Sequence, residues 1–136
     1  PLAGARVTSG FGYRRDPIHR RIGFHDGVDL SAPRGAVVLS AAAGRVVFSG
    51  RRGGAGNSVI LEHDNGTKTS YSHLDRCIVP PGANVPAGEA IGLVGSTGRS
   101  TGPHLHFVVS MNGKLVNPLR VVGRTAKELA ALLPDY

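Results

Sequence analysis

The stretch "NSVILEHDNGTKTSYSHL", residues 57–74, contains two alternating runs of apolar and polar residues on either side of an Asn-Gly pair. Such alternation is typical of a strand with one buried face, because successive side chains point to opposite faces. The segment "DNGT" (64–67) supplies the residues of a tight turn, so runs 57–63 and 67–74 are predicted to form an antiparallel hairpin. Alternation along the second run predicts that Tyr71 and His73 share one face.

The rest of the chain repeats this pattern. "HLHFVVS" (104–110) and "KLVNP" (114–118) flank a second Asn-Gly turn, and further short apolar runs occupy 36–40, 44–50 and 90–95. The 20 glycines and nine prolines that interrupt these runs favour an all-β fold of antiparallel sheets over βαβ units. The 136 residues are predicted to form a single domain, 1–136. A capping box at Thr125 and Glu128 predicts a short C-terminal helix over about 125–133.

The formal net charge of +7 predicts an anionic partner, whether nucleic acid, an acidic membrane or an acidic polymer such as a cell wall. An aromatic content of 5% with no Trp argues against a stacking platform for single-stranded nucleic acid. No apolar run approaches the roughly 20 residues of a membrane span. Much of the positive charge gathers at 13–21 and 49–54, where either a solvated surface or a substrate-attracting rim is expected. The chain starts at Pro1, and we expect a trimmed or processed fragment in which targeting signals cannot be read.

The histidines carry the chemistry. In "GPHLHF" (102–107), His104 and His106 are two residues apart, so on a strand they share a face with Cα atoms roughly 6–7 Å apart. In "FHDGVDL" (24–30), Asp29 follows His25 by four positions, and a straight strand would hold the two Cα atoms about 13 Å apart. A bend at the intervening glycine would bring them together.

Imidazoles and one carboxylate with an open fourth position form a normal ligand set for catalytic zinc. The chain has no Cys cluster and no H-E-x-x-H helix, so a general base would have to be one of its histidines. His63 has no motif partner and is predicted to be structural or exposed.

Five segments together resemble the lysostaphin/LytM-type zinc metallopeptidases, which are bacterial cell-wall endopeptidases: "SGFGYRRDP", "FHDGVDLSAP", "GNSVILEH", "TSYSHL" and "GSTGRSTGPHLHF". The similarity runs from about residue 7 to residue 118, and the H-x-x-x-D, Y-x-H-L and H-x-H motifs occur in the family's order. The resemblance implies a compact barrel-like sandwich of antiparallel sheets with a groove over one of them.

The resemblance also implies site roles. The implied ligands of one Zn²⁺ are His25, Asp29 and His106, and the implied catalytic pair is His104 and His73. Asn57 resembles a substrate-contacting position, although a role in a turn is an alternative. Tyr71 is expected either to line the groove and contact substrate or to pack in the core.

The implied activity is zinc-dependent hydrolysis of peptide cross-links in bacterial peptidoglycan, with a histidine as general base. The resemblance implies cleavage of either glycyl bonds of cross-bridges or the D-Ala to meso-diaminopimelate cross-link, and we expect the latter, in the periplasm or cell wall. The implied partners are peptide stems rather than nucleic acid, together with a regulatory flanking domain or protein. Two alternatives stay open: a non-catalytic LytM-like module that activates a cell-wall amidase by contact, and a carrier or nucleic-acid module that uses the basic loops. The intact motifs argue against the first alternative, and the low aromatic content argues against the second.

Overall fold

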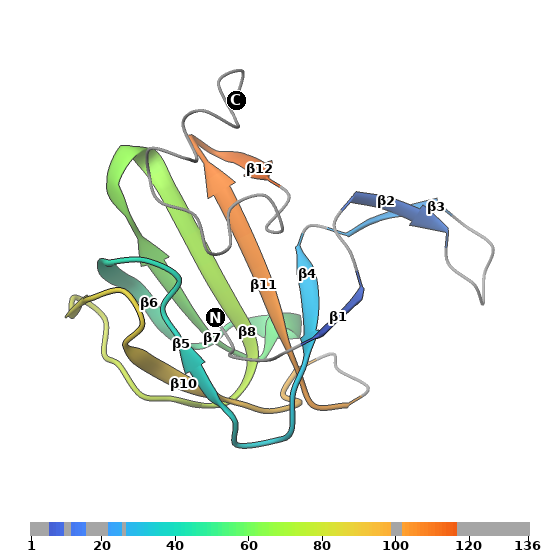
Figure 1. Ribbon diagram of the computed structural model, residues 1–136, viewed down its shortest axis with the longest axis horizontal. Helices are drawn as coiled ribbons and strands as arrows, with labels where there is room; N and C mark the ends of the chain where they lie inside the picture. Colours follow the sequence, from blue (N-terminus) through green and yellow to red (C-terminus); the bar gives the residue numbers. More distant parts are fainter. Residues whose placement is uncertain (1–5, 10–11, 16–21, 26, 99–101, 117–136) are drawn as a thin grey trace.

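The structure, a computed structural model, describes residues 6–9, 12–15, 22–25, 27–98 and 102–116 (Figure 1). Side chains are described within 27–98 and 102–116, apart from Val28 and Asn65. The predicted C-terminal helix and most of the basic segment 13–21 lie outside the described residues. The part of the chain that the structure describes contains no helix long and apolar enough to cross a membrane.

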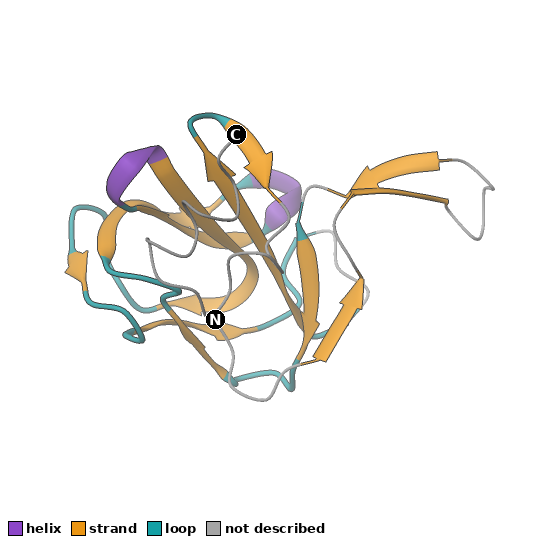
Figure 2. Cartoon of the chain, turned by 45° about the horizontal axis from the view of Figure 1, so that its top comes forward, coloured by secondary structure: helices purple, strands orange, loops and turns teal. Residues whose placement is uncertain are grey.

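The described chain is almost entirely antiparallel β-structure, so the predicted fold class is confirmed (Figure 2). The strands are β1 (Arg6–Ser9), β2 (Gly12–Arg15), β3 (Ile22–His25), β4 (Val28–Ser31), β5 (Val37–Leu39), β6 (Gly44–Arg51), β7 (Asn57–Glu62), β8 (Thr67–Cys77), β9 (Asn84–Val85), β10 (Ala90–Val94), β11 (His104–Met111) and β12 (Lys114–Val116). Two short 3₁₀ turns, η1 (Gly53–Ala55) and η2 (Asp64–Gly66), are the helical segments in this part of the chain.

A ten-stranded sheet follows the order β1-β4-β11-β8-β7-β6-β9, with β12 paired to β11 and β10 paired to both β5 and β8. Strands β2 and β3 form a separate two-stranded sheet. In Figure 1, β8 and β11 run side by side through the middle of the molecule, and β5 and β10 lie across their lower ends. Both Asn-Gly hairpins form as predicted, because β7 pairs with β8 and β11 pairs with β12.

The core lies on one face of the central strands. Tyr71 of β8 and Phe107 of β11 are both 0% exposed, and their ring centroids are 5.2 Å apart. Among the described side chains, fourteen hydrophobic ones are buried in this cluster: Leu30, Val38, Val46, Val59, Leu61, Tyr71, Leu74, Val85, Ile91, Val94, Leu105, Phe107, Val109 and Val116. Because these residues fix β8 and β11 from behind, the opposite face of the same strands is held rigidly for other uses.

A β-bulge in β8 changes which side chains face the core. Asn57 pairs with Leu74 and Val59 pairs with Tyr71, so Ser58 alone lies opposite two residues of β8, Ser72 and His73. His73 has a positive φ of 63°, an uncommon conformation for a residue with a side chain. The prediction that Tyr71 and His73 share one face is therefore wrong, because the extra residue turns His73 to the other side of the sheet.

The chain bends at Gly27, between the end of β3 at His25 and the start of β4 at Val28, as the sequence predicted. The structure adds a second reason for glycine at this position. A Cβ atom on Gly27 would lie 2.2 Å from the carbonyl oxygen of Phe107 in β11. Gly27 therefore lets β4 start close against β11, which sets the position of Asp29.

Replacing Gly27 with Ala is expected to lower the free energy of unfolding by about 1–3 kcal/mol, because the new methyl group must push β4 away from β11. Urea unfolding followed by circular dichroism measures the loss. Gly102→Ala is the matched control, since a Cβ at Gly102 meets no atom within 4 Å. Equal stability of the two variants would contradict this account of Gly27.

Candidate active site

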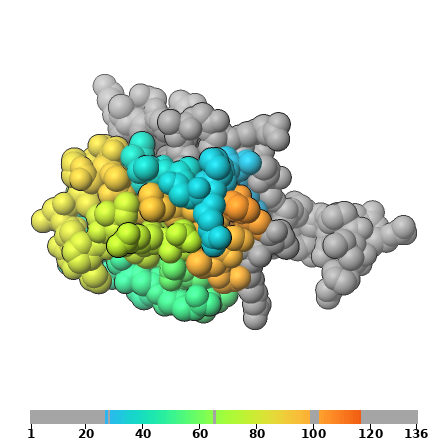
Figure 3. Space-filling model, turned by 90° about the horizontal axis from the view of Figure 1, so that it is seen from below, coloured from blue at the N-terminus to red at the C-terminus, as the bar shows by residue number. Residues whose placement is uncertain are grey.

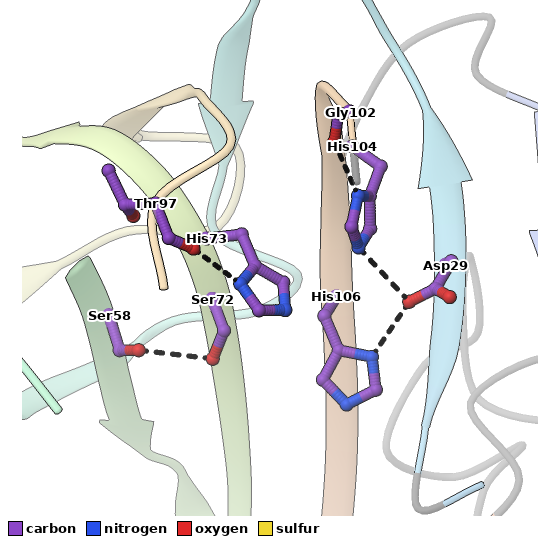
Figure 4. A network of polar contacts seen from close by, with 8 residues as sticks. All are labelled: Asp29, Ser58, Ser72, His73, Thr97, Gly102, His104 and His106. Atoms are coloured by element: carbon purple, nitrogen blue, oxygen red, sulfur yellow. Dashed lines mark hydrogen bonds and ion pairs between the residues drawn. The ribbon is translucent and has the colours of Figure 1, made fainter. Parts of the chain in front are cut away.

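Three strands bring polar side chains into one row on the face opposite the core. Asp29 of β4 pairs directly with His106 of β11, and His106 pairs on its other side with Ser72 of β8. His106 Nδ1 lies 2.9 Å from Asp29 Oδ1 (Figure 4). The strand register thus places Asp29 of the H-x-x-x-D motif next to His106 of the H-x-H motif, although the two residues are 77 positions apart in the sequence.

His104 points into the same cluster from β11. Its Nδ1 donates a hydrogen bond to the carbonyl oxygen of Gly102 at 2.8 Å, and its Nε2 lies 3.6 Å from Asp29 Oδ1. A carbonyl oxygen can only accept, so the ring proton sits on Nδ1 and the lone pair of the neutral ring sits on Nε2. The basic nitrogen of His104 therefore faces the carboxylate.

His73 completes the cluster from the bulge in β8. Its Nδ1 donates to the carbonyl oxygen of Thr97 at 2.7 Å, so in the neutral ring its lone pair is also on Nε2. The ring centroids of His73 and His104 are 4.9 Å apart, and His73 is 8% exposed. The pKa of His73 is lowered mainly by burial, although the hydrogen bond to Thr97 partly opposes this shift. Burial therefore favours the neutral ring, which can accept a proton.

Thr97 is a residue of this site that the sequence analysis missed. Its hydroxyl donates to the carbonyl oxygen of Leu74 at 2.7 Å and accepts the backbone N–H of Asn57 at 3.0 Å. A Cβ on Gly56 would lie 2.4 Å from the Thr97 hydroxyl oxygen, so the two loops are in close contact. The glycines around "GGAG" (53–56) and "GSTG" (95–98) were the available signal for this loop contact.

The structure brings some of the predicted site residues together, but not all of them. Asp29, His73, His104 and His106 gather in one cluster, as Figure 4 shows. The backbone of His25 ends β3 opposite Gly12, but its side chain lies outside the described residues. The side chain of Asn57 donates to the backbone carbonyl of Asp75 at 3.3 Å, an anchoring contact at the start of β7.

Tyr71 belongs to the core rather than to the site. Its hydroxyl interacts with Thr69 Oγ1 at 2.8 Å and accepts the N–H of Ala41 at 3.0 Å, and burial raises its pKa to about 12. The expectation that Tyr71 contacts substrate is wrong, because a side chain 0% exposed behind the sheet cannot reach it, and the alternative of core packing holds. The structural role predicted for His63 is confirmed by its contacts with Ala43 O at 2.8 Å and Thr69 Oγ1 at 2.7 Å.

The donor atoms of the cluster suit a divalent cation. Two ligands bound to one tetrahedral zinc at about 2.0–2.1 Å lie about 3.3 Å apart, close to the 2.9 Å between Asp29 Oδ1 and His106 Nδ1. The lone pair on His104 Nε2 also faces the Asp29 carboxylate, so a basic nitrogen lies next to these two donor atoms. Among the described side chains, no three His, Cys, Asp or Glu residues form a group that could hold a metal ion.

A groove of about 790 Å³ runs along the strands from this cluster. Its lining comes from β7, β8, β11, β12 and the η1 turn: Arg52, Gly54, Ala55, Ile60, Lys68, Thr69, Ser70, Ser72, His73, His106, Val108, Ser110 and Leu115. In the space-filling view of Figure 3, segments around β4 (blue), β8 (yellow-green) and β11 (orange) meet on one face. The groove thus reaches His73 and His106 of the histidine cluster.

Curated relatives match most of this chain. It is 50% identical over 121 residues to the DD-carboxypeptidase/endopeptidase Mpg of Neisseria meningitidis serogroup B, covering 89% of this chain and 28% of the relative. The chain is 39% identical over 127 residues to the peptidoglycan DD-endopeptidase ShyB of Vibrio cholerae. This match covers 93% of this chain and 30% of the relative. The chain therefore spans less than a third of the length of these relatives.

Solved structures share the fold. A zinc-containing peptidase from Vibrio cholerae superposes with a TM-score of 0.81 at 40% identity, over 86% of this chain and 37% of that one. The catalytic domain of lysostaphin from Staphylococcus simulans superposes with a TM-score of 0.78 at 32% identity. The superposition covers 88% of this chain and 93% of the lysostaphin domain. The expected lysostaphin-type architecture is thus confirmed.

The family model of Peptidase family M23 matches residues 23–118, which include all three motifs and every strand from β4 to β12. The family model thus matches the region in which the three motifs carry the resemblance. The chain belongs to Peptidase family M23.

Proposed function

We propose that this chain is a zinc-dependent endopeptidase that hydrolyses peptide cross-links of bacterial peptidoglycan, at the bond between D-Ala and meso-diaminopimelate. The observation that carries the proposal is the convergence of His73, His104 and His106 on Asp29, with the protons of His73 and His104 fixed by backbone carbonyls. The fold alone does not imply this arrangement, because proteins that share a fold can differ in the residues of the active site.

Asp29 and His106 would hold the zinc ion together with His25, which leaves His104 beside the metal without being a ligand. When bound, zinc lowers the pKa of a coordinated water toward about 7 and polarises the scissile carbonyl. The pairing of β4 with β11 supports this assignment, since it brings Asp29 Oδ1 and His106 Nδ1 to 2.9 Å, a hydrogen-bond distance that would widen by about 0.4 Å to hold a metal ion.

His104 and His73 would move the proton. His104 Nε2 takes a proton from the attacking water as the water oxygen bonds to the carbonyl carbon. The C–N bond then breaks, and the same proton passes to the leaving amine, so the products are one carboxylate and one free amino group. His73, from the neighbouring strand, would accept a proton at Nε2 and, once protonated, would support the negative charge that develops on the carbonyl oxygen.

The assignment of peptidoglycan is supported by two observations. The relatives are named as a DD-carboxypeptidase/endopeptidase and a peptidoglycan DD-endopeptidase. The groove is lined by apolar, hydroxyl and cationic side chains, and the cationic ones suit peptide stems that carry carboxylates. Because peptidoglycan lies outside the cytoplasmic membrane, the domain would act in the periplasm or cell wall.

The zinc-loaded chain is expected to release monomers from purified peptidoglycan with direct D-Ala to meso-diaminopimelate cross-links. Mass analysis should find D-Ala with a new carboxyl terminus and diaminopimelate with a freed amino group. The matched control is peptidoglycan cross-linked through glycine bridges, which should remain intact. Cleavage confined to glycyl bonds would contradict the assigned bond. Stimulation of an amidase without any cleavage by the chain itself would instead indicate the non-catalytic alternative.

A further inference from the structure

Two exposed cationic side chains, Arg52 and Lys68, line the groove. Arg52 Nη1 donates to the Ser70 hydroxyl oxygen at 3.5 Å, so its guanidinium lies over β8. Lys68 lies on the same face of β8, two residues from Ser70. No Asp or Glu is among the described residues that line the groove. The groove is therefore complementary to an anionic ligand over this part of its length.

The backbone holds Arg52 in a defined position relative to the catalytic cluster. The N–H of Arg52 donates to the carbonyl of Gly56 at 2.8 Å, and the N–H of Ala55 donates back to the carbonyl of Arg52 at 3.1 Å. Gly56 in turn packs against Thr97, whose carbonyl accepts the hydrogen bond from His73. Arg52 and His73 are thus connected through one closely packed loop contact.

The register gives the distance between this positive charge and the site of hydrolysis. Ser72 lies opposite His106, and Ser70 lies opposite Val108, two residues further along both strands. Two residues of a strand span about 6.6 Å. A peptide extended along β8 with its scissile bond at the His106 row would therefore bring a group within two residues of that bond to Arg52.

We propose that Arg52 is a specificity-determining residue that binds a carboxylate of the peptide stem within two residues of the scissile bond. The inference rests on the proposed peptidase function and names the feature of the substrate that this site selects. The guanidinium is suited to this role because its planar fork pairs with both oxygens of a carboxylate. The diaminopimelate carboxylate on the carbon attached to the scissile nitrogen is the nearest carboxylate that the proposed bond supplies, and it lies inside this two-residue span.

The test compares two soluble cross-linked peptides that differ in one group. In one peptide the diaminopimelate carboxylate next to the scissile bond is intact, and in the other it is a carboxamide. The wild-type chain is expected to favour the carboxylate peptide by roughly fivefold to tenfold in kcat/KM, the range of an ion pair exposed to solvent with an added charge-assisted hydrogen bond. Arg52→Gln should cleave both peptides at similar rates, with the change mainly in KM.

Arg51→Gln is the matched control, because Arg51 ends β6 next to Arg52 but is not among the residues that line the groove. This control should keep the full preference of the wild-type chain. Arg52→Lys should keep part of the preference, since it retains the charge and loses the fork. A preference that is unchanged in Arg52→Gln, or lost equally in Arg51→Gln, would overturn the inference while leaving the peptidase function standing. Failure of the wild-type chain to cleave either peptide would instead overturn the proposed function.

Discussion

Replacing His104 with Ala is expected to lower the rate of cross-link hydrolysis by about 10²–10⁴-fold while the chain keeps its zinc. The reason is that His104 Nε2 would act as the general base, a contribution that typically has this size, whereas the proposed ligands are other residues. The hydrolysis rate is measured on a soluble cross-linked peptide, and zinc content is measured on the same sample by elemental analysis. His73→Ala should behave in the same way with a smaller loss.

His63→Gln is the matched control for both variants, because His63 is a histidine bonded to Ala43 and Thr69 and placed outside the cluster. It should hydrolyse the peptide at nearly the wild-type rate once folded. If His104→Ala lost its zinc, His104 would be a ligand rather than the base. Hydrolysis by His104→Ala at the wild-type rate would remove it from the mechanism altogether.

Replacing Asp29 with Ala is expected to abolish both zinc binding and hydrolysis. Asp29 supplies the carboxylate that contacts His106 and faces His104, and two imidazoles alone make a poor ligand set for zinc. Elemental analysis after dialysis at a defined free zinc concentration measures the loss. The wild-type chain should retain one equivalent under the same conditions.

Asp75→Ala provides the control for this substitution, because Asp75 is a carboxylate on β8 that pairs with Arg34 at 3.3 Å rather than with a histidine of the cluster. It should keep its zinc and most of its activity. Full zinc occupancy in Asp29→Ala would show that the carboxylate is not a ligand. The zinc ligands would then have to be assigned among the histidines.

The sequence predicted the central part of this fold because the decisive signals were local. Each Asn-Gly turn lies between alternating runs, so the pairings of β7 with β8 and of β11 with β12 could be read directly from neighbouring residues. The placement of His104 and His106 on one face follows from strand alternation alone. The bend at Gly27 was also predictable, since a glycine lay between two motif residues.

Features that depend on distant pairing could not be predicted in the same way. The bulge at Ser72 and His73 arises from the register against β7, and it reversed the predicted relation between Tyr71 and His73. The contact of Thr97 with Gly56 joins two loops about 40 residues apart, and neither loop has a periodic pattern. Strands β1 to β4 and β9 were not predicted because each has four residues or fewer and, unlike the short β5 and β12, none lies in a longer apolar run or next to an Asn-Gly turn.

Restoring zinc to the metal-free chain tests the central claim most directly. The chain is first stripped with a chelator, and zinc is then added in steps while hydrolysis of a peptide dimer linked from D-Ala to meso-diaminopimelate is followed by mass analysis. The account predicts no hydrolysis without zinc and a rate that rises until one equivalent is bound and then stays constant. Hydrolysis by the metal-free chain at the zinc-loaded rate, or no hydrolysis at any zinc concentration, would contradict it.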